Sequence, residues 1–373
     1  EATRQGRTAL LVPDANAPEA AIIEGIQVFP IRNLRQAWDF LKGDVIIPPF
    51  QLDRRAFFES HRNYEIDFDE VKGQHHVKRA LEVAAAGGHN LLMIGPPGTG
   101  KSMLAKRVPS IMPEMTEDEA IETTKIHSIS GLLDPKRAFL TTRPFRAPHH
   151  TISDAGLLGG GVNPGPGEVS LAHHGILFLD ELPEFRRQTL EVMRQPLEDG
   201  TVSISRAAGS FQFPARFMLI AAMNPCPCGY YGDVKRECRC SPRQIESYRQ
   251  RISGPLLDRI DLHIEVPLVN FRELSSNTPS GENSETIRER VVAARNIQLA
   301  RFKKSTVTTN STMTSRLVRQ HCQLDSESTG YLEHAMEEMN FSARAHDRIL
   351  KVARTLADLG GSPDIRSQDI LEA

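Results

Sequence analysis

A glycine-rich segment, GPPGTGKS at residues 95–102, has the residue types and spacing of a phosphate-binding loop. Its glycines allow backbone N–H groups to turn towards phosphate oxygens, and Lys101 supplies a positive charge for the β- and γ-phosphates. An apolar strand, NLLMIG, precedes the segment and a helical pattern follows it, whereas a chance glycine-rich turn would lack that context. The sequence therefore predicts an ATP site formed by Gly95, Pro96, Pro97, Gly98, Thr99, Gly100, Lys101, Ser102 and Met103.

Two adjacent carboxylates, Asp180 and Glu181, follow the apolar run ILFL further along the chain. Sheet enzymes bind their ligands at the carboxyl ends of buried strands, which is where these two acids would lie. Asp180 and the hydroxyl of Ser102 would hold Mg²⁺, and Glu181 would orient and polarise the attacking water. The alternative, a strand that merely ends in solvated acids, is less favoured beside a phosphate loop. Together the two motifs predict an enzyme that hydrolyses ATP.

Three polar residues are candidates for sensing the γ-phosphate. Asn224 ends the apolar strand RFMLIAAMN and would lie between the two motif strands, although an Asn after a strand is usually a turn residue. Arg259 in LLDRIDL is either an arginine finger that reaches a neighbouring subunit or the partner of Asp258 or Asp261 in an internal ion pair. Arg344, near the start of a later helix, is either a phosphate sensor or a surface arginine.

Four of the five cysteines gather in the segment CPCGYYGDVKRECRC, at Cys226, Cys228, Cys238 and Cys240. Paired thiols in a reducing cytoplasm more often bind metal than form stable disulfides, and four thiolates around one Zn²⁺ make a closed structural site. The C-x-C spacing is tighter than the usual C-x₂-C, so free or redox-active thiols remain the alternative. The cluster predicts a zinc site in the segment between Asn224 and the candidate finger.

Apolar strands alternate with helical patterns through residues 69–268. The runs NLLMIG, ILFLDE and RFMLIAAMN predict buried strands, so we expect an α/β fold with a parallel sheet covered by helices on both faces. After Pro267 the strand signals stop, and a basic amphipathic helix over residues 284–304 begins a helical lid. Ser342 and Ser367 are predicted N-caps of two later helices.

The composition is that of a soluble globular protein, with 39% hydrophobic and 25% charged residues and no apolar run long enough to cross a bilayer. A length of 373 residues predicts two or three compact units. The net charge of -2 does not decide about nucleic-acid binding, because a ring assembly can concentrate basic residues in its channel. The N-terminus has neither a signal-peptide core nor an initiator Met, so we expect a cytoplasmic piece of a longer protein.

The segments GPPGTGKS, ILFLDELPEF, AAMNPCPCG and SGPLLDRIDL, in this order, resemble the magnesium-chelatase-like AAA+ family. Within that family the chain is similar over nearly its whole length to the ComM/YifB branch. The segment RPFRAPHHTISDAGLLGGG and the cysteine-bearing loop are the most discriminating parts, because a phosphate loop alone fits many unrelated ATPases. The resemblance implies a homohexameric ring in which Asn224 is sensor 1, Arg259 is the arginine finger and Arg344 is sensor 2.

The resemblance also implies a division into domains. Residues 1–47 would be the end of a Lon-like N-terminal domain, followed by a linker at 48–68. Residues 69–268 would form the AAA+ core, and residues 269–373 the helical magnesium-chelatase-type C-terminal domain. Three features of the core are implied as well: a helix-2 insert at about 140–168, a hairpin before sensor 1 at about 200–216, and the cysteine cluster at 226–240.

Both inserts point into the central channel in related ring motors, so their arginines are candidates for contacts with DNA phosphates. Such contacts grip DNA without reading its sequence, although each arginine is otherwise an ordinary surface charge. The candidates are Arg143, Arg146, Arg206 and Arg216. The paired histidines, His149 with His150 and His173 with His174, are weaker metal candidates, because adjacent side chains on a strand point to opposite faces.

The resemblance implies an ATP-driven helicase that promotes branch migration of DNA in homologous recombination during natural transformation. The alternative is a motor subunit of magnesium chelatase, which inserts Mg²⁺ into a porphyrin; the cysteine cluster and the Lon-like remnant favour the helicase, because the chelatase subunit lacks both. An unfoldase for a Lon-like protease is less favoured, and the presence of Lys101 and Glu181 argues against a non-enzymatic scaffold. The expected partners are branched, single- or double-stranded DNA and further copies of the chain.

Overall fold

The computed structural model describes the chain over residues 2–3, 5–21, 23, 25–52, 64–133, 139–161, 165–206, 209–233, 236–268 and 281–373. They form two compact units: unit 1 is Glu1–Asn63 with Met115–Thr142, and unit 2 is Tyr64–Glu114 with Arg143–Ala373. Parts of the predicted linker, of both predicted inserts and of the start of the predicted C-terminal domain lie outside the described residues. Within the described ranges, no helix combines the length and the apolar character needed to cross a bilayer.

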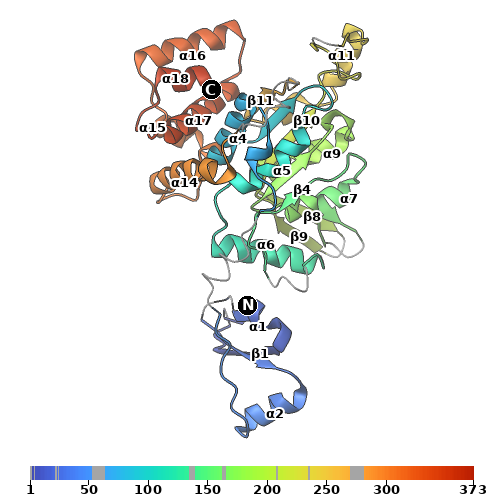
Figure 1. The fold of residues 1–373 in the computed structure, drawn as a ribbon, viewed down its shortest axis with the longest axis vertical. Coiled ribbons are helices and arrows are strands. Elements are labelled where there is room, and N and C mark those ends of the chain that lie inside the picture. The colour runs from blue at the N-terminus through green and yellow to red at the C-terminus, as the bar shows by residue number, and fades with distance from the viewer. Residues whose placement is uncertain are drawn as a thin grey trace. The chain divides into compact units, whose positions relative to one another are not determined.

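Unit 2 is built on a five-stranded sheet in the order β11-β3-β10-β7-β4, and all neighbouring strands are parallel (Figure 1). The strand β10 pairs with β3 on one side and with β7 on the other. The strands that lead into GPPGTGKS and into Asp180 are therefore separated by one strand only. This sheet confirms the predicted parallel α/β fold. Its strands are β3 (Leu91–Ile94), β4 (Phe145–Arg146), β7 (Ile176–Leu179), β10 (Met218–Met223) and β11 (Leu262–Glu265).

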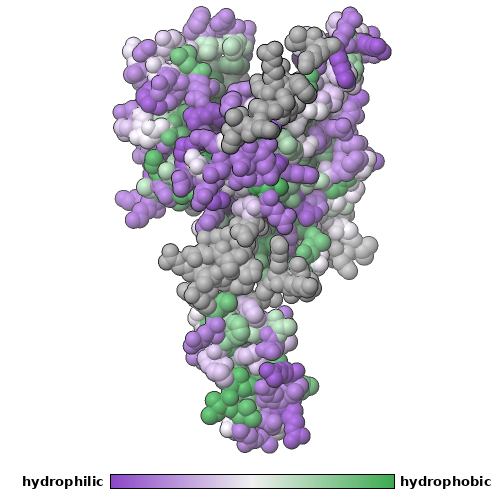
Figure 2. Space-filling view, in the orientation of Figure 1, coloured by the Kyte–Doolittle hydropathy of each residue, from purple (hydrophilic) through white to green (hydrophobic). Residues whose placement is uncertain are grey.

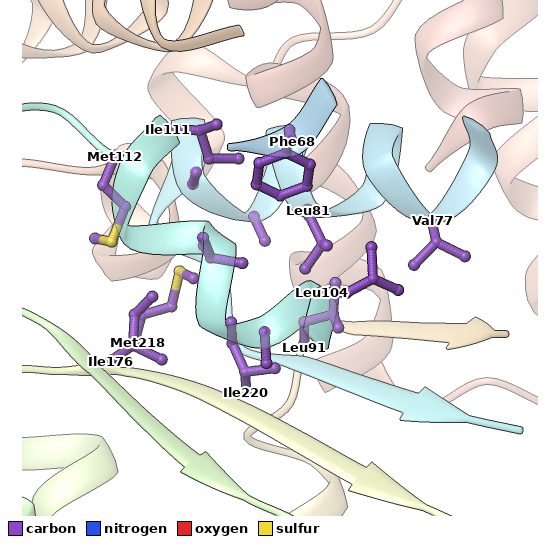
Figure 3. Packing of buried hydrophobic residues seen from close by; sticks show 14 of the residues in the cluster. Phe68, Val77, Leu81, Leu91, Leu104, Ile111, Met112, Ile176, Met218 and Ile220 are labelled. Atoms are coloured by element: carbon purple, nitrogen blue, oxygen red, sulfur yellow. The ribbon is translucent and has the colours of Figure 1, made fainter. Parts of the chain in front are cut away.

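Helices cover both faces of this sheet, because successive side chains of each buried strand point to opposite sides. Leu91 of β3 belongs to the hydrophobic cluster under α4 (His75–Gly87) and α5 (Lys101–Ile111), whereas Leu92 belongs to the cluster on the other face. Figure 3 shows the first cluster, with side chains of both helices gathered over the strands. The second cluster contains Leu190 of α9 (Arg187–Val192) and several other apolar side chains.

An antiparallel hairpin lies between β7 and β10 along the chain. Its strands are β8 (Thr201–Arg206) and β9 (Gly209–Pro214), and α10 (Arg194–Asp199) leads into it through a left-handed Gly200 at φ 64°. Val202 is buried in the second cluster, whereas Phe211 is 38% exposed. The hairpin is thus anchored on β8 and solvated along much of β9.

Shorter elements connect these parts of unit 2. They are η2 (Phe68–Glu70), α7 (Asp154–Leu158), β5 (Gly159–Gly160), β6 (Gly165–Pro166), α8 (Glu168–Leu171), η3 (Leu182–Glu184), α11 (Pro242–Arg249) and α12 (Gly254–Leu257).

The C-terminal part of unit 2 is helical. It comprises α14 (Ser284–Arg301), η4 (Asn310–Thr312), α15 (Ser315–His321), α16 (Ser326–Glu338), α17 (Ala343–Leu359) and α18 (Ser367–Glu372). The helix predicted at residues 284–304 is therefore present, and its Ile287, Val291 and Ala294 are buried in the first cluster. Ser342 caps α17 as predicted, since its side chain accepts a hydrogen bond from the backbone N–H of Ala345.

The prediction for Ser367 is wrong, because Ser367 is the first residue of α18 and Arg366 occupies the N-cap. The side chain of Asp369 accepts from the backbone N–H of Arg366, as an acidic residue at the third helical position does in a capping box.

Unit 1 contains two parallel strands that sequence analysis did not predict, β1 (Ala9–Pro13) and β2 (Gln27–Ile31). The helix after them is α2 (Leu34–Lys42), which ends at a left-handed Gly43. Its apolar face is largely exposed, with Leu34 90% and Trp38 60% accessible, and Figure 2 shows hydrophobic residues on the surface of this unit. The unit also holds η1 (Asp14–Asn16), α1 (Ala17–Ala21) and α6 (Glu117–Ile129).

A buried charge network joins three segments of the helical region. Asp358 of α17 has a fully buried side chain and accepts hydrogen bonds from Arg301 of α14 at 2.8 Å and 2.5 Å. It also accepts from the side-chain amide of Asn310 at 2.8 Å and from Arg354 at 3.2 Å. Removing the charge from one member of a buried network is costly, since its partners remain buried without compensation.

We therefore expect Asp358→Asn to lower the free energy of unfolding by about 3–5 kcal/mol, because two buried guanidinium groups would lose their counter-charge. Urea denaturation followed by circular dichroism measures this change. Asp364→Asn, at an exposed position of the same region, is the control and should stay within about 0.5 kcal/mol of the wild type. Equal stability of the two variants would contradict the prediction.

Candidate nucleotide site

The phosphate-binding loop connects the end of β3 to the start of α5, so its backbone N–H groups open at the carboxyl edge of the sheet. Gly98 and Gly100 have φ values of 82° and 83°, a left-handed conformation that glycine adopts without strain. A Cβ atom at Gly95 would lie 2.2 Å from the carbonyl oxygen of Val266, so only glycine lets the loop pass this close to the end of β11. The loop is thereby held between the end of β3, from which it continues, and the end of β11.

Lys101 lies in the centre of the loop, with 8% of its surface exposed. Its Nζ donates hydrogen bonds to the carbonyl oxygens of Gly95 at 2.6 Å and Pro96 at 2.9 Å, and Asn224 Oδ1 lies 3.5 Å away. Burial lowers the pKa of Lys101, and the negative charges of Asp180 and Glu181 oppose this shift. The ammonium group can therefore exchange neutral carbonyl partners for phosphate oxygens.

The two residues predicted to hold Mg²⁺ contact each other directly. Ser102 Oγ donates a hydrogen bond of 2.7 Å to Asp180 Oδ2, and Asp180 Oδ1 accepts from the backbone N–H of Glu181 at 2.9 Å. A hydroxyl and a carboxylate at the mouth of a phosphate loop are oxygen ligands of the kind that a partly hydrated Mg²⁺ takes. The donor set therefore fits Mg²⁺.

Glu181 has an unusual backbone and a side-chain partner that the sequence analysis did not identify. Its φ of 52° is left-handed, which is uncommon for a residue other than glycine, and its side chain is 53% exposed. Its Oε2 lies 3.4 Å from Nδ1 of His150, which follows β4. The contact arises because β4 pairs with β7, and no pattern in the sequence indicates that pairing.

The prediction that the two rings of each histidine pair point to opposite faces is wrong. The rings of His149 and His150 lie 4.1 Å apart, and those of His173 and His174 lie 3.9 Å apart. Neither pair belongs to a strand, and His174 has a left-handed φ of 56° that brings its ring back beside its neighbour. Alternation of side chains applies only in extended backbone.

The candidate arginine finger is paired inside the chain, but with neither of the acids next to it. Arg259 forms an ion pair with Glu198 of α10 and donates to the carbonyl oxygen of Pro255. Its side chain is 12% exposed. The partner Glu198 is distant in sequence and was not predicted.

The candidate sensor on the helical region is exposed. Arg344 at the start of α17 has 68% of its side chain accessible, and Nη1 lies 3.4 Å from Asp258 Oδ2. Arg348, one turn later, contacts the same carboxylate at 3.4 Å and donates to the carbonyl oxygen of Ile260 at 3.0 Å. The segment that carries Arg259 is thus bound directly to α17.

The sulfur atoms of Cys226, Cys228, Cys238 and Cys240 all lie within 4.8 Å of one another, and no disulfide joins them. Three of the separations are 3.4, 3.7 and 3.6 Å. A tetrahedral metal with four metal–sulfur bonds of about 2.3 Å requires sulfur atoms about 3.8 Å apart, so these side chains could hold a metal ion. Hydrogen bonds from the backbone of Tyr230 and Arg239 lower the pKa of the Cys228 thiol to about 6.

The cysteine segment packs on the phosphate loop. Gly229 lies in it with a left-handed φ of 85°, and a Cβ atom there would be 2.7 Å from Cδ of Pro97. Its backbone N–H donates to the carbonyl oxygen of Cys226 at 3.0 Å, two residues after Asn224. One short segment therefore joins the end of β10, the sulfur cluster and the loop that would hold the phosphates.

A cavity of about 800 Å³ lies between this segment and the ends of β3, β10 and β11. Gly95, Pro96, Met223, Tyr231 and Leu268 are among its lining residues. Its position beside the loop and its mixture of apolar and polar walls are suited to a small ligand.

The arginines predicted to contact DNA have different surroundings. Arg143 donates to the carbonyl oxygens of Pro113, His174 and Glu114, and Arg146 forms a two-bonded ion pair with Glu168. Arg216, just after the hairpin, is exposed. The side chain of Arg206 lies outside the described residues.

Comparisons with known proteins agree with these motifs. The family described as "Magnesium chelatase, subunit ChlI" matches residues 67–274, and "Magnesium chelatase, subunit ChlI C-terminal" matches residues 281–373. Competence protein ComM of Haemophilus influenzae is 44% identical over 378 residues, covering 100% of this chain and 72% of that protein. Uncharacterized protein YifB of Escherichia coli is 43% identical, covering 100% and 71%. The magnesium-chelatase 38 kDa subunit of Rhodobacter capsulatus is 27% identical, covering 53% and 55%.

Two glycines of the cysteine segment allow its contact with the phosphate loop to be tested. Gly229 and Gly232 have φ values of 85° and 80°, but only a Cβ at Gly229 would meet Pro97, since nothing lies within 4 Å of the other. We expect Gly229→Ala to weaken ATP binding about threefold to tenfold, because the added methyl displaces the loop. Gly232→Ala carries the same backbone strain and should bind ATP within about twofold of the wild type.

Fluorescence titration with a labelled ATP analogue measures both affinities. If the two variants bound the analogue equally well, the contact with Pro97 would have no part in shaping the loop.

Proposed function

Because the chain belongs to the ComM/YifB branch of the magnesium-chelatase-like AAA+ ATPases, we propose that it is an ATP-driven DNA motor promoting branch migration in homologous recombination during natural transformation. The observation that carries the proposal is the convergence of Lys101, Ser102, Asp180 and Glu181 at the carboxyl ends of β3 and β7, which β10 separates. The identity of 44% to a relative named a competence protein supports the setting in transformation. The proposed location is the cytoplasm.

In the proposed reaction, Lys101 and the loop amides bind the β- and γ-phosphates. Ser102 and Asp180 would hold Mg²⁺, which would neutralise charge on the phosphate oxygens. Glu181 orients the attacking water, and Asn224, 3.5 Å from the ammonium of Lys101, lies where it can help to place it. The residues that hydrolyse ATP thus come from one subunit, except for one arginine that its neighbour contributes.

That arginine is Arg259, which in this proposal leaves Glu198 and reaches the γ-phosphate of an adjacent subunit in a homohexameric ring. Arg344 would act from α17 as the second sensor. Both arginines are bound here to carboxylates, which are the groups in a protein most similar in charge to a phosphate. When either arginine exchanges its carboxylate partner for a phosphate, an anion still compensates its positive charge.

The proposed DNA contacts lie on the hairpin formed by β8 and β9. Arg216 is exposed beside it, and Arg206 is in β8. Arg143 and Arg146 already have carbonyl or carboxylate partners, so we propose that they stabilise the segment around β4. We therefore expect the contacts with DNA phosphates to come chiefly from the hairpin. Such contacts would be insensitive to base sequence and weakened by salt.

A motor subunit of magnesium chelatase is the second candidate, favoured by the two family matches and by the 27% identity to the Rhodobacter capsulatus subunit. Both candidates require ATP hydrolysis. They differ in whether branched DNA stimulates it.

We expect branched DNA to raise the rate of ATP hydrolysis and the protein to move a DNA junction in a strand-exchange assay with labelled arms. Glu181→Gln and Lys101→Ala should each lower hydrolysis by about 100-fold or more, because one removes the water-orienting carboxylate and the other a phosphate ligand. Glu184→Gln is the matched control, since its carboxylate pairs with Arg251 outside the predicted loop.

Robust hydrolysis by the wild type without stimulation by any DNA, and without junction movement, would overturn the DNA motor and leave the chelatase-type motor. Absence of hydrolysis in the wild type would overturn both.

We propose that the metal held by the four cysteines is Zn²⁺, in a closed structural site. Four sulfur ligands at tetrahedral separations select Zn²⁺ or iron, and four cysteines around one ion are typical of structural zinc. Because Cys226 follows Asn224 closely, the ion would fix the segment between the sensor and the phosphate loop.

Purified protein should contain about one zinc per chain, and the double substitution of Cys238 and Cys240 by serine should release it and weaken ring assembly, since two ligands are lost. Mass spectrometry of metals and size-exclusion chromatography measure the two effects. Cys322→Ser is the control, because Cys322 is buried at the end of α15 and does not belong to the cysteine cluster. This variant should keep the metal. Unchanged zinc in the double variant would refute the assignment.

A further inference from the structure

The side-chain amide of Asn90 lies between two segments that have separate roles in the proposed reaction. Its Nδ2 donates a hydrogen bond of 2.9 Å to the carbonyl oxygen of Arg259, the candidate arginine finger. Its Oδ1 accepts a hydrogen bond of 2.8 Å from the backbone N–H of Leu219 in β10, the strand that leads to Asn224. One amide therefore joins the segment of the finger to the strand of the predicted sensor.

The chemistry of an amide suits both of these backbone partners. A carbonyl oxygen requires a donor and an N–H group requires an acceptor, and asparagine offers both at the two ends of one planar group. The two partners also determine which end of the amide is the nitrogen. Aspartate has the same shape but no donor when ionised, so at position 90 it would set an oxygen against the carbonyl oxygen of Arg259.

The backbone of Asn90 and the residue before it hold the same segment. The carbonyl oxygen of Asn90 accepts from the backbone N–H groups of Asp261 and Leu262, each at 3.0 Å. Nδ1 of His89 lies 3.0 Å from Oδ2 of Asp261, and His89 is fully buried. Residues 259–262 are therefore fixed by two consecutive residues that lie directly before β3.

The ring of His89 is itself anchored in the helical region. Its Nε2 lies 2.8 Å from Oγ1 of Thr355, a fully buried residue of α17. Gly87 in the last turn of α4 leaves room for this contact, since a Cβ atom there would lie 2.2 Å from the ring. The support that holds the finger segment is thus packed against α17 and has little freedom to move.

The strand β3 connects this support to the phosphate loop of the same chain. It has four residues, ends at Ile94 directly before Gly95, and lies between β11 and β10 in the sheet. A strand paired on both sides is a rigid element, and groups placed on such elements are held more precisely than groups on loops. The loop that would bind ATP in one subunit and the arginine that would serve the next are therefore held at opposite ends of one strand.

We propose that Asn90 is a positioning residue for Arg259, whose backbone it holds in place for the ATP of the neighbouring subunit. This inference rests on the arginine that acts between subunits in the proposed function. The side chain of Arg259 has to exchange Glu198 for a phosphate, and it reaches a defined point only if its backbone stays fixed. Asn90 thus affects hydrolysis in the next subunit rather than in its own.

The test uses mixed rings, in which the two subunits that form one ATP site carry different substitutions. Donor chains carry Lys101→Ala, so they present the arginine but lack a phosphate ligand. Acceptor chains carry Arg259→Ala, so they bind ATP but present no arginine. Each chain alone should be inactive, and hydrolysis in a mixture occurs only where the ATP of an acceptor meets the arginine of a donor.

We expect Asn90→Asp in the donor to lower the rate of ATP hydrolysis by the mixture about tenfold to 100-fold, because repulsion from the carbonyl oxygen displaces the arginine. The same substitution in the acceptor should leave the rate within about threefold, since that chain has no arginine at position 259. Asn283→Asp in the donor is the matched control. Asn283 caps α14 by accepting from the backbone N–H of Thr286, which aspartate does equally well, so the rate should stay within about twofold.

An equal loss of activity with Asn90→Asp in the donor and in the acceptor would mean that Asn90 only supports the fold, and it would overturn the inference. An unchanged rate with the substituted donor would overturn it as well. Absence of hydrolysis in the mixture of the two parent chains is a separate result, which would overturn the arginine between subunits in the proposed function and this inference with it.

Discussion

The hydrogen bond between Ser102 and Asp180 is the contact on which the site depends. It joins the first turn of α5 to the end of β7 across the intervening strand β10, at 2.7 Å. Such a contact forms only if β3, β10 and β7 are parallel and end at the same edge of the sheet. Leu91 and Leu92 are buried on opposite faces of the sheet, which fixes β3 between its two helical layers and thereby fixes where the loop begins.

The segment after β10 extends this constraint beyond the sheet. Asn224 is directed towards Lys101, and a few residues later Gly229 touches Pro97 of the loop. Between these contacts lies Cys226, which is fully buried. A loop with this many fixed points has little conformational freedom left to lose when nucleotide binds, which is the benefit of preorganisation.

Local motifs and strand patterns were readable from the sequence, whereas contacts between distant segments were not. The glycines of the loop, the acids after ILFL and the buried strands each depend on neighbouring residues, and the sheet formed as expected. The pairing of Arg259 with Glu198 joins α10 to the segment that follows α12, and no local pattern encodes it. The contact of His150 with Glu181 likewise requires knowing that β4 lies beside β7.

Three charged side chains around the site have polar partners within the single chain. Arg344 lies beside Asp258, Arg259 beside Glu198, and Glu181 beside His150. Of these, Arg344 with Asp258 is an exposed ion pair, and exposed ion pairs contribute only about 0–1 kcal/mol. By contrast, Asp358 and its arginines are buried, and their separation would be expensive. The costly pairs therefore hold the helical region together, whereas the exposed pair of Arg344 with Asp258 can be broken at small cost.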